Sequence, residues 1–123
     1  MGKAAGFLSL PHYAQFFEKI LGKKVFAGTL NARASVAEVG KLRSRAKSAF
    51  RLVEKTVGKK KLSGVSCLKA TVSAYSQKEK IACLLVFPDK STHDKSVLEI
   101  VAAENLRQRL LLKDGDIVEI MVN

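Results

Sequence analysis

Residue types that commonly carry catalysis are present in this sequence, but their spacing matches no common catalytic motif. The chain contains neither the Gly-x-Ser-x-Gly turn of a serine hydrolase nor a His-Glu-x-x-His zinc motif. Gly58-Lys59 lacks the upstream glycine and the following Ser or Thr of a Walker loop. His12 and His93 have no evident partners, and no Cys and His residues have zinc-ligand spacing. Composition and spacing alone therefore predict only a small basic domain rich in β-structure.

The formal net charge of +11 is concentrated in residues 41–61. This basic segment contains nine Lys or Arg residues and one acid, Glu54, and such a charge attracts nucleic acid, nucleotides or phospholipid. Phe50 is the only aromatic residue in it, so base-stacking platforms are scarce. We expect Lys41 to Lys61 to form a solvated basic face that concentrates nucleotide and binds nucleic acid weakly, without sequence preference. A solubilising face without a partner is the open alternative.

Length and composition bound the organisation of the chain. Its 123 residues, 47% of them hydrophobic, suit one packed domain spanning 1–123. No run of 18 apolar residues is present, which excludes a membrane-spanning helix. Two cysteines, Cys67 and Cys83, are too few for a disulfide scaffold, so we expect reduced core residues in a cytoplasmic protein.

Three segments have helical signals. An aromatic and aliphatic stripe between Tyr13 and Leu21 predicts a helix that begins near Pro11 and ends before Gly22. Ser35 and Glu38 have capping-box spacing, which favours a helix over residues 35–50. Residues 103–110 have helical spacing as well.

The remaining apolar segments are typical of short strands. We expect strands at residues 6–10, 25–30, 65–73, 81–87, 97–101 and 117–122. Glu119 alternates outward in the last of them, and a polar loop over residues 89–96 precedes the fifth. Six short strands with small helices predict a mainly β, compact barrel with helical inserts.

Three segments together resemble one family, the archaeal CTP-dependent riboflavin kinases. The order and spacing of these segments carry the resemblance: Gly6-Phe7-Leu8-Ser9-Leu10-Pro11-His12-Tyr13 followed by Gly28-Thr29-Leu30-Asn31; Pro88-Asp89-Lys90-Ser91-Thr92-His93 followed by Leu98-Glu99-Ile100-Val101-Ala102; and Asn105-Leu106-Arg107 followed by Leu112-Lys113-Asp114-Gly115-Asp116. The resemblance runs from residue 2 to the end of the chain, except for the basic segment.

The resemblance implies a small six-stranded cradle-loop barrel that transfers the γ-phosphoryl group of CTP to riboflavin, giving FMN and CDP. It places the family's glycine-rich nucleotide loop on Gly2, Lys3, Ala4, Ala5 and Gly6. It places the second nucleotide segment on Glu104, Asn105, Leu106 and Arg107. The metal ligands fall on Thr29 and Asn31, with Mg²⁺ as the divalent ion. The flavin contacts fall on Ser91 and Glu99.

Physical chemistry supports these implied roles. Phosphoryl transfer depends on positioning and charge neutralisation more than on covalent catalysis. The oxygens of Thr29 and Asn31 alternate along a strand end and so point to one side, where phosphates would complete an octahedron around Mg²⁺. Asn105 opens a helix whose N-terminus favours an anion. Glu99 stands in an apolar strand, where ribityl hydroxyls would give it hydrogen bonds; it is also the candidate for deprotonating the attacking hydroxyl.

Alternatives stand beside this interpretation. Gly28 to Asn31 could be only a strand end with an Asx turn, and Glu99 could pair with a surface lysine. Family members normally carry a strand before the glycine-rich loop, and Ala4 stands where glycine is common. We therefore expect the first strand of the barrel to be either missing or encoded upstream of Met1. A nucleic-acid-binding barrel and a non-catalytic homologue are the two rival functions.

Overall fold

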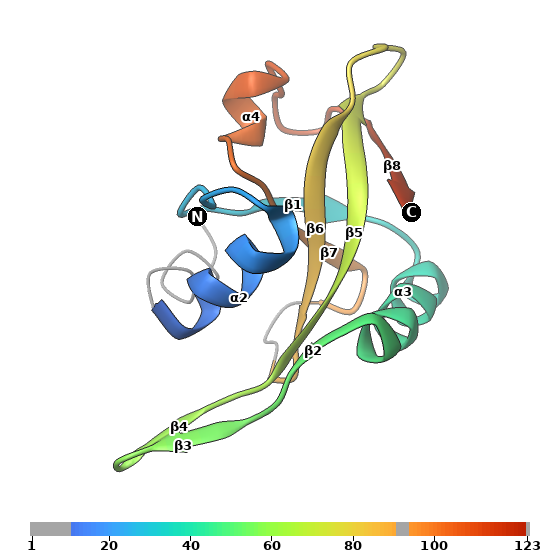
Figure 1. Ribbon diagram of the computed structural model, residues 1–123. Helices are drawn as coiled ribbons and strands as arrows, with labels where there is room; N and C mark the ends of the chain where they lie inside the picture. The colour runs from blue at the N-terminus through green and yellow to red at the C-terminus, as the bar shows by residue number, and fades with distance from the viewer. Residues whose placement is uncertain (1–10, 91–93, 123) are drawn as a thin grey trace.

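The structure is a computed structural model that describes residues 11–90 and 94–122. The expected strand at residues 6–10 lies outside this part. The described elements, in chain order, are α2 (Pro11–Leu21), β1 (Leu30–Arg33), α3 (Val36–Ala49), β2 (Phe50–Leu52), β3 (Lys55–Val57), β4 (Lys60–Leu62), β5 (Val65–Ala74), β6 (Ile81–Pro88), β7 (Val97–Val101), α4 (Leu106–Arg109) and β8 (Val118–Val122) (Figure 1).

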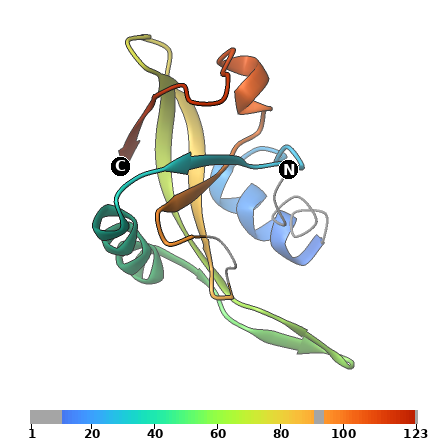
Figure 2. The same cartoon turned by 180° about the vertical axis from the view of Figure 1, so that it is seen from behind.

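Six strands form one antiparallel sheet in the order β1-β7-β6-β5-β2, with β8 also paired to β5. The ten-residue β5 pairs with β2 through residues 65–67 and with β8 through residues 70–74. The sheet curls into a half-barrel, seen from both sides in Figures 1 and 2. The mainly β, barrel-type fold expected from the sequence is confirmed.

Strands β3 and β4 form a separate two-stranded ribbon, whose register pairs Lys55 with Leu62 and Val57 with Lys60. The ribbon projects from the body of the molecule, beyond the ends of β2 and β5 (Figure 1). The basic segment is therefore divided between the helix α3, strand β2 and this ribbon.

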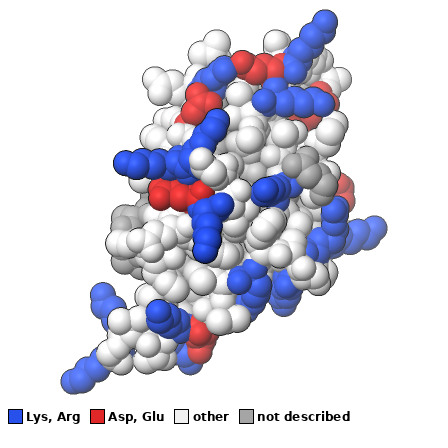
Figure 3. Space-filling model, in the orientation of Figure 1, with Lys and Arg blue, Asp and Glu red and all other residues white. Residues whose placement is uncertain are grey.

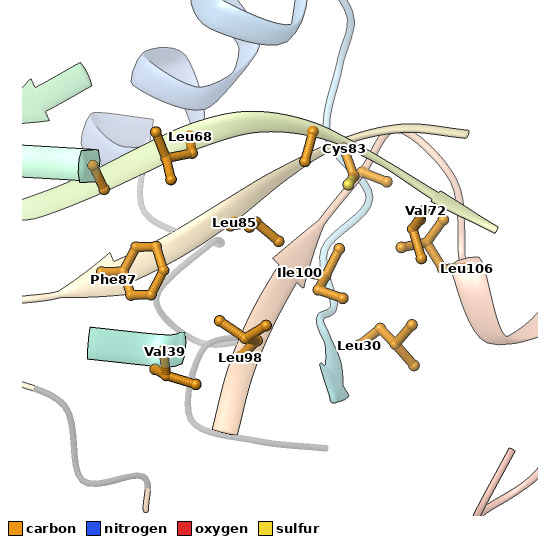
Figure 4. Packing of buried hydrophobic residues seen from close by; sticks show 13 residues of the cluster. Leu30, Val39, Leu68, Val72, Cys83, Leu85, Phe87, Leu98, Ile100 and Leu106 are labelled. Carbon is orange, nitrogen blue, oxygen red and sulfur yellow. The ribbon is translucent and has the colours of Figure 1, made fainter. Parts of the chain in front are cut away.

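The main hydrophobic core fills the inner face of the curled sheet. Leu85, Ile100 and Val39 are almost completely buried there, with Leu98 and Leu106 beside them (Figure 4). The helix α3 contributes Val39 to this core, and α4 contributes Leu106. Full burial of one such side chain contributes about 1.5–3 kcal/mol, so the helices are held to the sheet mainly by packing.

A second core covers the opposite face of the sheet, beneath α2. Tyr13 and Phe17 of α2 pack there against Leu84, Val86 and other residues of the sheet. The Tyr13 hydroxyl also donates a hydrogen bond of 2.8 Å to the carbonyl of Ser63. The helix that the aromatic and aliphatic stripe predicts is therefore confirmed, and its Tyr13 and Phe17 side chains are buried in this core.

Helix ends follow their sequence signals. Gly22 has a φ of +78° and its N–H reaches the Glu18 carbonyl at 2.8 Å, which ends α2 as expected. At α3, the Ser35 hydroxyl accepts from the Glu38 N–H at 3.1 Å and donates to the Glu38 carboxylate at 3.0 Å. The helix predicted at residues 103–110 is only four residues long, because Asn105 caps it and Leu111 takes a φ of +55° just beyond it.

The strand expected over residues 25–30 is wrong, because the first described strand begins only at Leu30. The Gly28 N–H bonds to the Phe26 carbonyl at 2.9 Å, a tight turn that interrupts an extended chain. A single bond of 2.8 Å from the Phe26 N–H to the Ala102 carbonyl holds this segment beside the end of β7. The other predicted strands within the described residues are confirmed to within one residue at each end.

Candidate active site

A cavity of about 530 Å³ opens where the start of β1, the end of β7 and α4 meet. Two segments implied by the resemblance line it together, the one at Thr29 and Asn31 and the one from Glu104 to Arg107. These segments are far apart in the sequence, and the antiparallel pairing of β1 with β7 brings them together, because it places Leu30 beside Ile100 shortly before the chain reaches Glu104. The cavity is therefore our candidate active site.

The first wall of the cavity is built by the tight turn that precedes β1. The Leu30 side chain enters the main core, so Thr29 and Asn31 on either side of it are left to line the cavity. The close turn at Gly28, itself buried, brings the Thr29 hydroxyl into the wall. The expectation that both oxygens lie on one side agrees with this arrangement.

Thr29 Oγ1 has the properties expected of a ligand atom. It is buried, and within the described residues it has no hydrogen-bond partner. A buried hydroxyl without a partner costs free energy, about 1–3 kcal/mol, unless a ligand satisfies it. Neutral hydroxyl and amide oxygens suit Mg²⁺, whose other positions phosphates and water can fill. The residues present therefore fit a phosphate-bound divalent ion. Among the described residues no group of three or more His, Cys, Asp or Glu could hold a metal ion.

The second wall is the segment that caps α4. Asn105 Oδ1 accepts a bond of 3.3 Å from the Gln108 N–H, so this side-chain oxygen serves the helix cap. The helix that follows has only four residues. Its dipole is consequently small, and the expectation that a helix N-terminus attracts the anion here has little physical support.

Ion pairs hold the charged side chains of this wall. Arg107 Nη1 lies 2.8 Å from Asp114 Oδ1, and Arg109 Nε lies 3.2 Å from Glu104 Oε1. Arg109 also forms a double hydrogen bond with Glu79, which holds the pKa of the Glu79 carboxyl below its ordinary value. Among the described residues that line the cavity, Arg107 is the cation available to a phosphate, and Asp114 orients it.

Glu99 lies directly across from Asn31 in the β1–β7 register. Its side chain is buried, with 5% exposure. By strand alternation it shares the sheet face of Val101, and by register that of Val86, which is the face that α2 covers. Glu99 is therefore next to the cavity wall without being one of the residues that line the cavity.

Several predicted site residues lie outside the described residues. They are Gly2, Lys3, Ala4, Ala5, Gly6 and Ser91. His93, which has no evident partner in the sequence, also lies outside the described residues. His12 lies within the described part, half-buried at the start of α2, with its ring 5.0 Å from that of Tyr13 in an edge-to-face contact.

Sequence reasoning missed the apolar and supporting parts of the cavity. Phe26 and Ala102 form part of the wall, and Arg109 holds Glu104 in place. Nothing in the sequence distinguishes the first two from ordinary core residues. The Arg109–Glu104 separation of five residues is also not a helical contact spacing, so only the fold reveals this pair.

The chain matches a known protein family over almost its full length. Residues 1–122 match the model of the family CTP-dep_RFKase, described as "Domain of unknown function DUF120". The chain belongs to this family. The resemblance inferred from the sequence is thereby confirmed.

Relatives in the family carry the name riboflavin kinase. One from Sulfurisphaera tokodaii is 36% identical over 126 residues, covering 99% of this chain and 88% of the relative. Another, from Sulfolobus acidocaldarius, is 32% identical and covers 99% of this chain and 75% of the relative. A third, from Methanobrevibacter smithii, is 31% identical, with 98% and 90% covered. None of the described helices is long and apolar enough to cross a membrane.

Proposed function

We propose that this protein is a CTP-dependent riboflavin kinase that transfers the γ-phosphoryl group of CTP to the 5′-hydroxyl of the ribityl chain, giving FMN and CDP. The observation that carries the proposal is the shared cavity: the Thr29–Asn31 segment and the Glu104–Arg107 segment line it together in a chain of this family. In the reaction, a bond forms between the ribityl oxygen and the γ-phosphorus. The bond to the β,γ-bridging oxygen breaks, and CDP leaves.

The residues of the cavity position and neutralise the triphosphate. Thr29 Oγ1 and Asn31 Oδ1 would hold Mg²⁺, which when bound neutralises phosphate charge and orients the γ-phosphoryl group. Arg107 supplies a positive charge on the opposite wall, oriented by Asp114. Four of the five residues from 2 to 6 are Gly or Ala, and this composition suits close approach of backbone N–H groups to phosphate oxygens.

The acceptor side of the site is assigned to Glu99 and Ser91. Glu99 faces Asn31 across the β1–β7 pair, so its carboxylate is close to the residue that would hold the metal. A buried carboxylate that accepts hydrogen bonds from ribityl hydroxyls orients the chain and can take the proton of the attacking hydroxyl. Ser91 would contact the flavin from the segment between β6 and β7.

A mass-spectrometric assay tests the proposal. Purified protein is incubated with riboflavin, MgCl₂ and each of CTP, ATP, GTP and UTP in turn, and FMN and the nucleoside diphosphate are measured. We expect FMN and CDP in equal amounts with CTP, and little product with the other nucleotides. Equal turnover with ATP would contradict the CTP preference. Absence of FMN with every donor would support a non-catalytic homologue instead.

A further inference from the structure

The ribbon formed by β3 and β4 has no role in the cavity and little support from the rest of the fold. It pairs with no third strand among the described residues, and its residues are exposed except for the half-buried Leu62. An isolated two-stranded ribbon is at best marginally stable in water. Its exposed surface includes Val57, with 54% exposure. These properties suit a segment that a partner covers.

The two faces of the ribbon differ in charge. Residues that pair across an antiparallel ribbon share a face, so Lys55, Val57, Lys60 and Leu62 lie on one face, which we call the cationic face. Lys61 and Thr56 lie on the other. There the Lys61 ammonium lies 3.2 Å from the Glu54 carboxylate. Within the described residues, neither Lys55 nor Lys60 forms an ion pair, so the cationic face keeps its charge.

The shape of this surface decides between anionic partners. A small nucleotide needs a concave site, whereas the ribbon projects from the body (Figure 1). Binding to a membrane surface needs a broad apolar face. Val57 is the one exposed apolar side chain among the four residues of the cationic face. Lys and Arg side chains crowd the ribbon and the lower part of the view, while most Asp and Glu side chains lie higher (Figure 3). A polyanion that surrounds the ribbon is the partner that fits.

We propose that the β3–β4 ribbon binds duplex DNA without sequence preference, with Lys55 and Lys60 on phosphates and Val57 against the groove wall. Two strands about 4.8 Å apart fit the B-DNA major groove, which is about 12 Å wide. The major groove of duplex RNA is too narrow and deep for side chains to read. Single strands are bound through aromatic stacking, and the ribbon has no aromatic residue. This activity is independent of the proposed kinase reaction.

Fluorescence anisotropy with a labelled 20-base-pair duplex tests the proposal. The double variant Lys55→Gln with Lys60→Gln should weaken binding at 50 mM salt by roughly 100-fold, about tenfold for each lost phosphate contact. In a plot of the logarithm of the binding constant against the logarithm of salt concentration, the magnitude of the slope should fall by about 2. Two control variants test whether the position of the lost charge matters. Lys61→Gln changes the other ribbon face, and Lys41→Gln with Lys47→Gln removes the same charge from α3. Each should weaken binding less than threefold.

The alternatives are separated by further arms of the experiment. Equal weakening by the ribbon and α3 variants would overturn the proposal, because net charge alone would then explain binding. Tighter binding to single-stranded DNA, duplex RNA or vesicles of anionic lipid would overturn it too. A dimer in analytical ultracentrifugation without DNA, lost in the Lys55 and Lys60 variant, would mean that a second copy covers the ribbon. Equal melting temperatures of all variants ensure that the comparison concerns folded proteins.

Discussion

At the scale of single residues, Thr29 and Asn31 differ in their exposure to solvent, although they are only two positions apart in the sequence. Thr29 Oγ1 is buried, whereas Asn31 is exposed on β1. Substitution of Asn31 therefore removes a candidate ligand without disturbing the core, which makes it the better probe of the metal site.

The Asn31→Ala variant should lower kcat by about 10²-fold, the effect typical of losing a group that stabilises charge in the transition state. Its melting temperature should stay within the error of the wild-type value, because the side chain is exposed. Steady-state assays over a Mg²⁺ titration measure the first effect. Full activity at limiting Mg²⁺ would remove Asn31 from the metal site.

Glu99→Gln should weaken the use of riboflavin and leave the affinity for CDP unchanged. The substitution keeps the size of the side chain and removes its charge, and a hydrogen bond to a charged group contributes about 1.5–3 kcal/mol, or roughly 10 to 100-fold in kcat/KM for riboflavin. Isothermal calorimetry with CDP is the control. If CDP affinity falls while kcat/KM for riboflavin is kept, Glu99 belongs to the nucleotide side.

At the scale of elements, the base of the ribbon is joined to the end of β6. Arg51 of β2 makes two hydrogen bonds to Asp89, of 2.5 and 2.6 Å, and a third of 3.0 Å to Ser66. The Asp89 N–H bonds to the Gly64 carbonyl at 3.0 Å. This junction holds the first residue of the segment that carries Ser91, which the proposed function assigns to the flavin.

Gly64→Ala should destabilise the fold by about 1–3 kcal/mol, the usual cost of overpacking. An added Cβ would lie 2.5 Å from Asp89 Oδ2 and 2.8 Å from the Leu52 carbonyl oxygen, and the carbonyl belongs to the backbone and cannot simply turn away. Urea unfolding measures the loss. Gly40→Ala on the exposed side of α3 is the matched control, because nothing lies within 4 Å of its Cβ. It should stabilise the protein by up to about 1 kcal/mol.

The Arg51–Asp89 pair should make stability depend on pH. Hydrogen bonds from Arg51 hold the pKa of the Asp89 carboxyl below its ordinary value of 3.8. A carboxyl pKa depressed by folding stabilises the protein above the unfolded-state pKa, and this contribution is lost as pH falls through the folded-state pKa. Both side chains are about one-third exposed, so the contribution is small, on the order of 1 kcal/mol.

Asp89→Asn is the corresponding test. The wild-type protein should exceed the variant in unfolding free energy near pH 7, and the difference should shrink as the pH falls below 3.8. Urea titrations across this range, with guanidinium avoided because its salt screens the pair, give the two curves. A difference that is the same at all pH values would show that packing rather than charge explains the effect.

At the scale of the whole molecule, the sheet separates two cores, and each contains one free thiol. Cys67 belongs to the core beneath α2, and Cys83 to the core inside the half-barrel. Burial raises the pKa of both thiols to about 12. Neither is reactive at neutral pH while its core is closed, because the thiolate is the nucleophile.

Thiol labelling should therefore report unfolding of the two cores separately. Under native conditions, a disulfide reagent should modify neither cysteine within minutes. Both cysteines should react fully in about 6 M urea, a concentration of the order that unfolds small domains. Cys67→Ser and Cys83→Ser assign the signals. Rapid labelling of Cys67 alone in native buffer would mean that α2 opens independently of the half-barrel.

Several helices and strands of this protein follow directly from local patterns in the sequence. The aromatic stripe of α2, the capping pair of α3 and the alternation of β8 are local patterns, and each element formed where its pattern lies. Local signals of this kind depend on neighbours within one helical turn or two strand positions, so no distant contact is needed to interpret them. The family was equally evident from the order of three short segments, which the family match confirmed.

Where these elements meet depends on contacts between residues that are distant in the sequence. The hydrogen bond from the Gly28 N–H to the Phe26 carbonyl put a turn where a strand was expected. The bond from the Phe26 N–H to the Ala102 carbonyl holds this segment beside the end of β7, where Thr29 and the Glu104–Arg107 segment line one cavity. The basic segment was one run of charge in the sequence, yet the register of the ribbon put Lys61 beside Glu54 and left Lys55 and Lys60 on the opposite face. Contacts of this kind join residues from different elements, and their free energy depends on a geometry that exists only once these elements have paired.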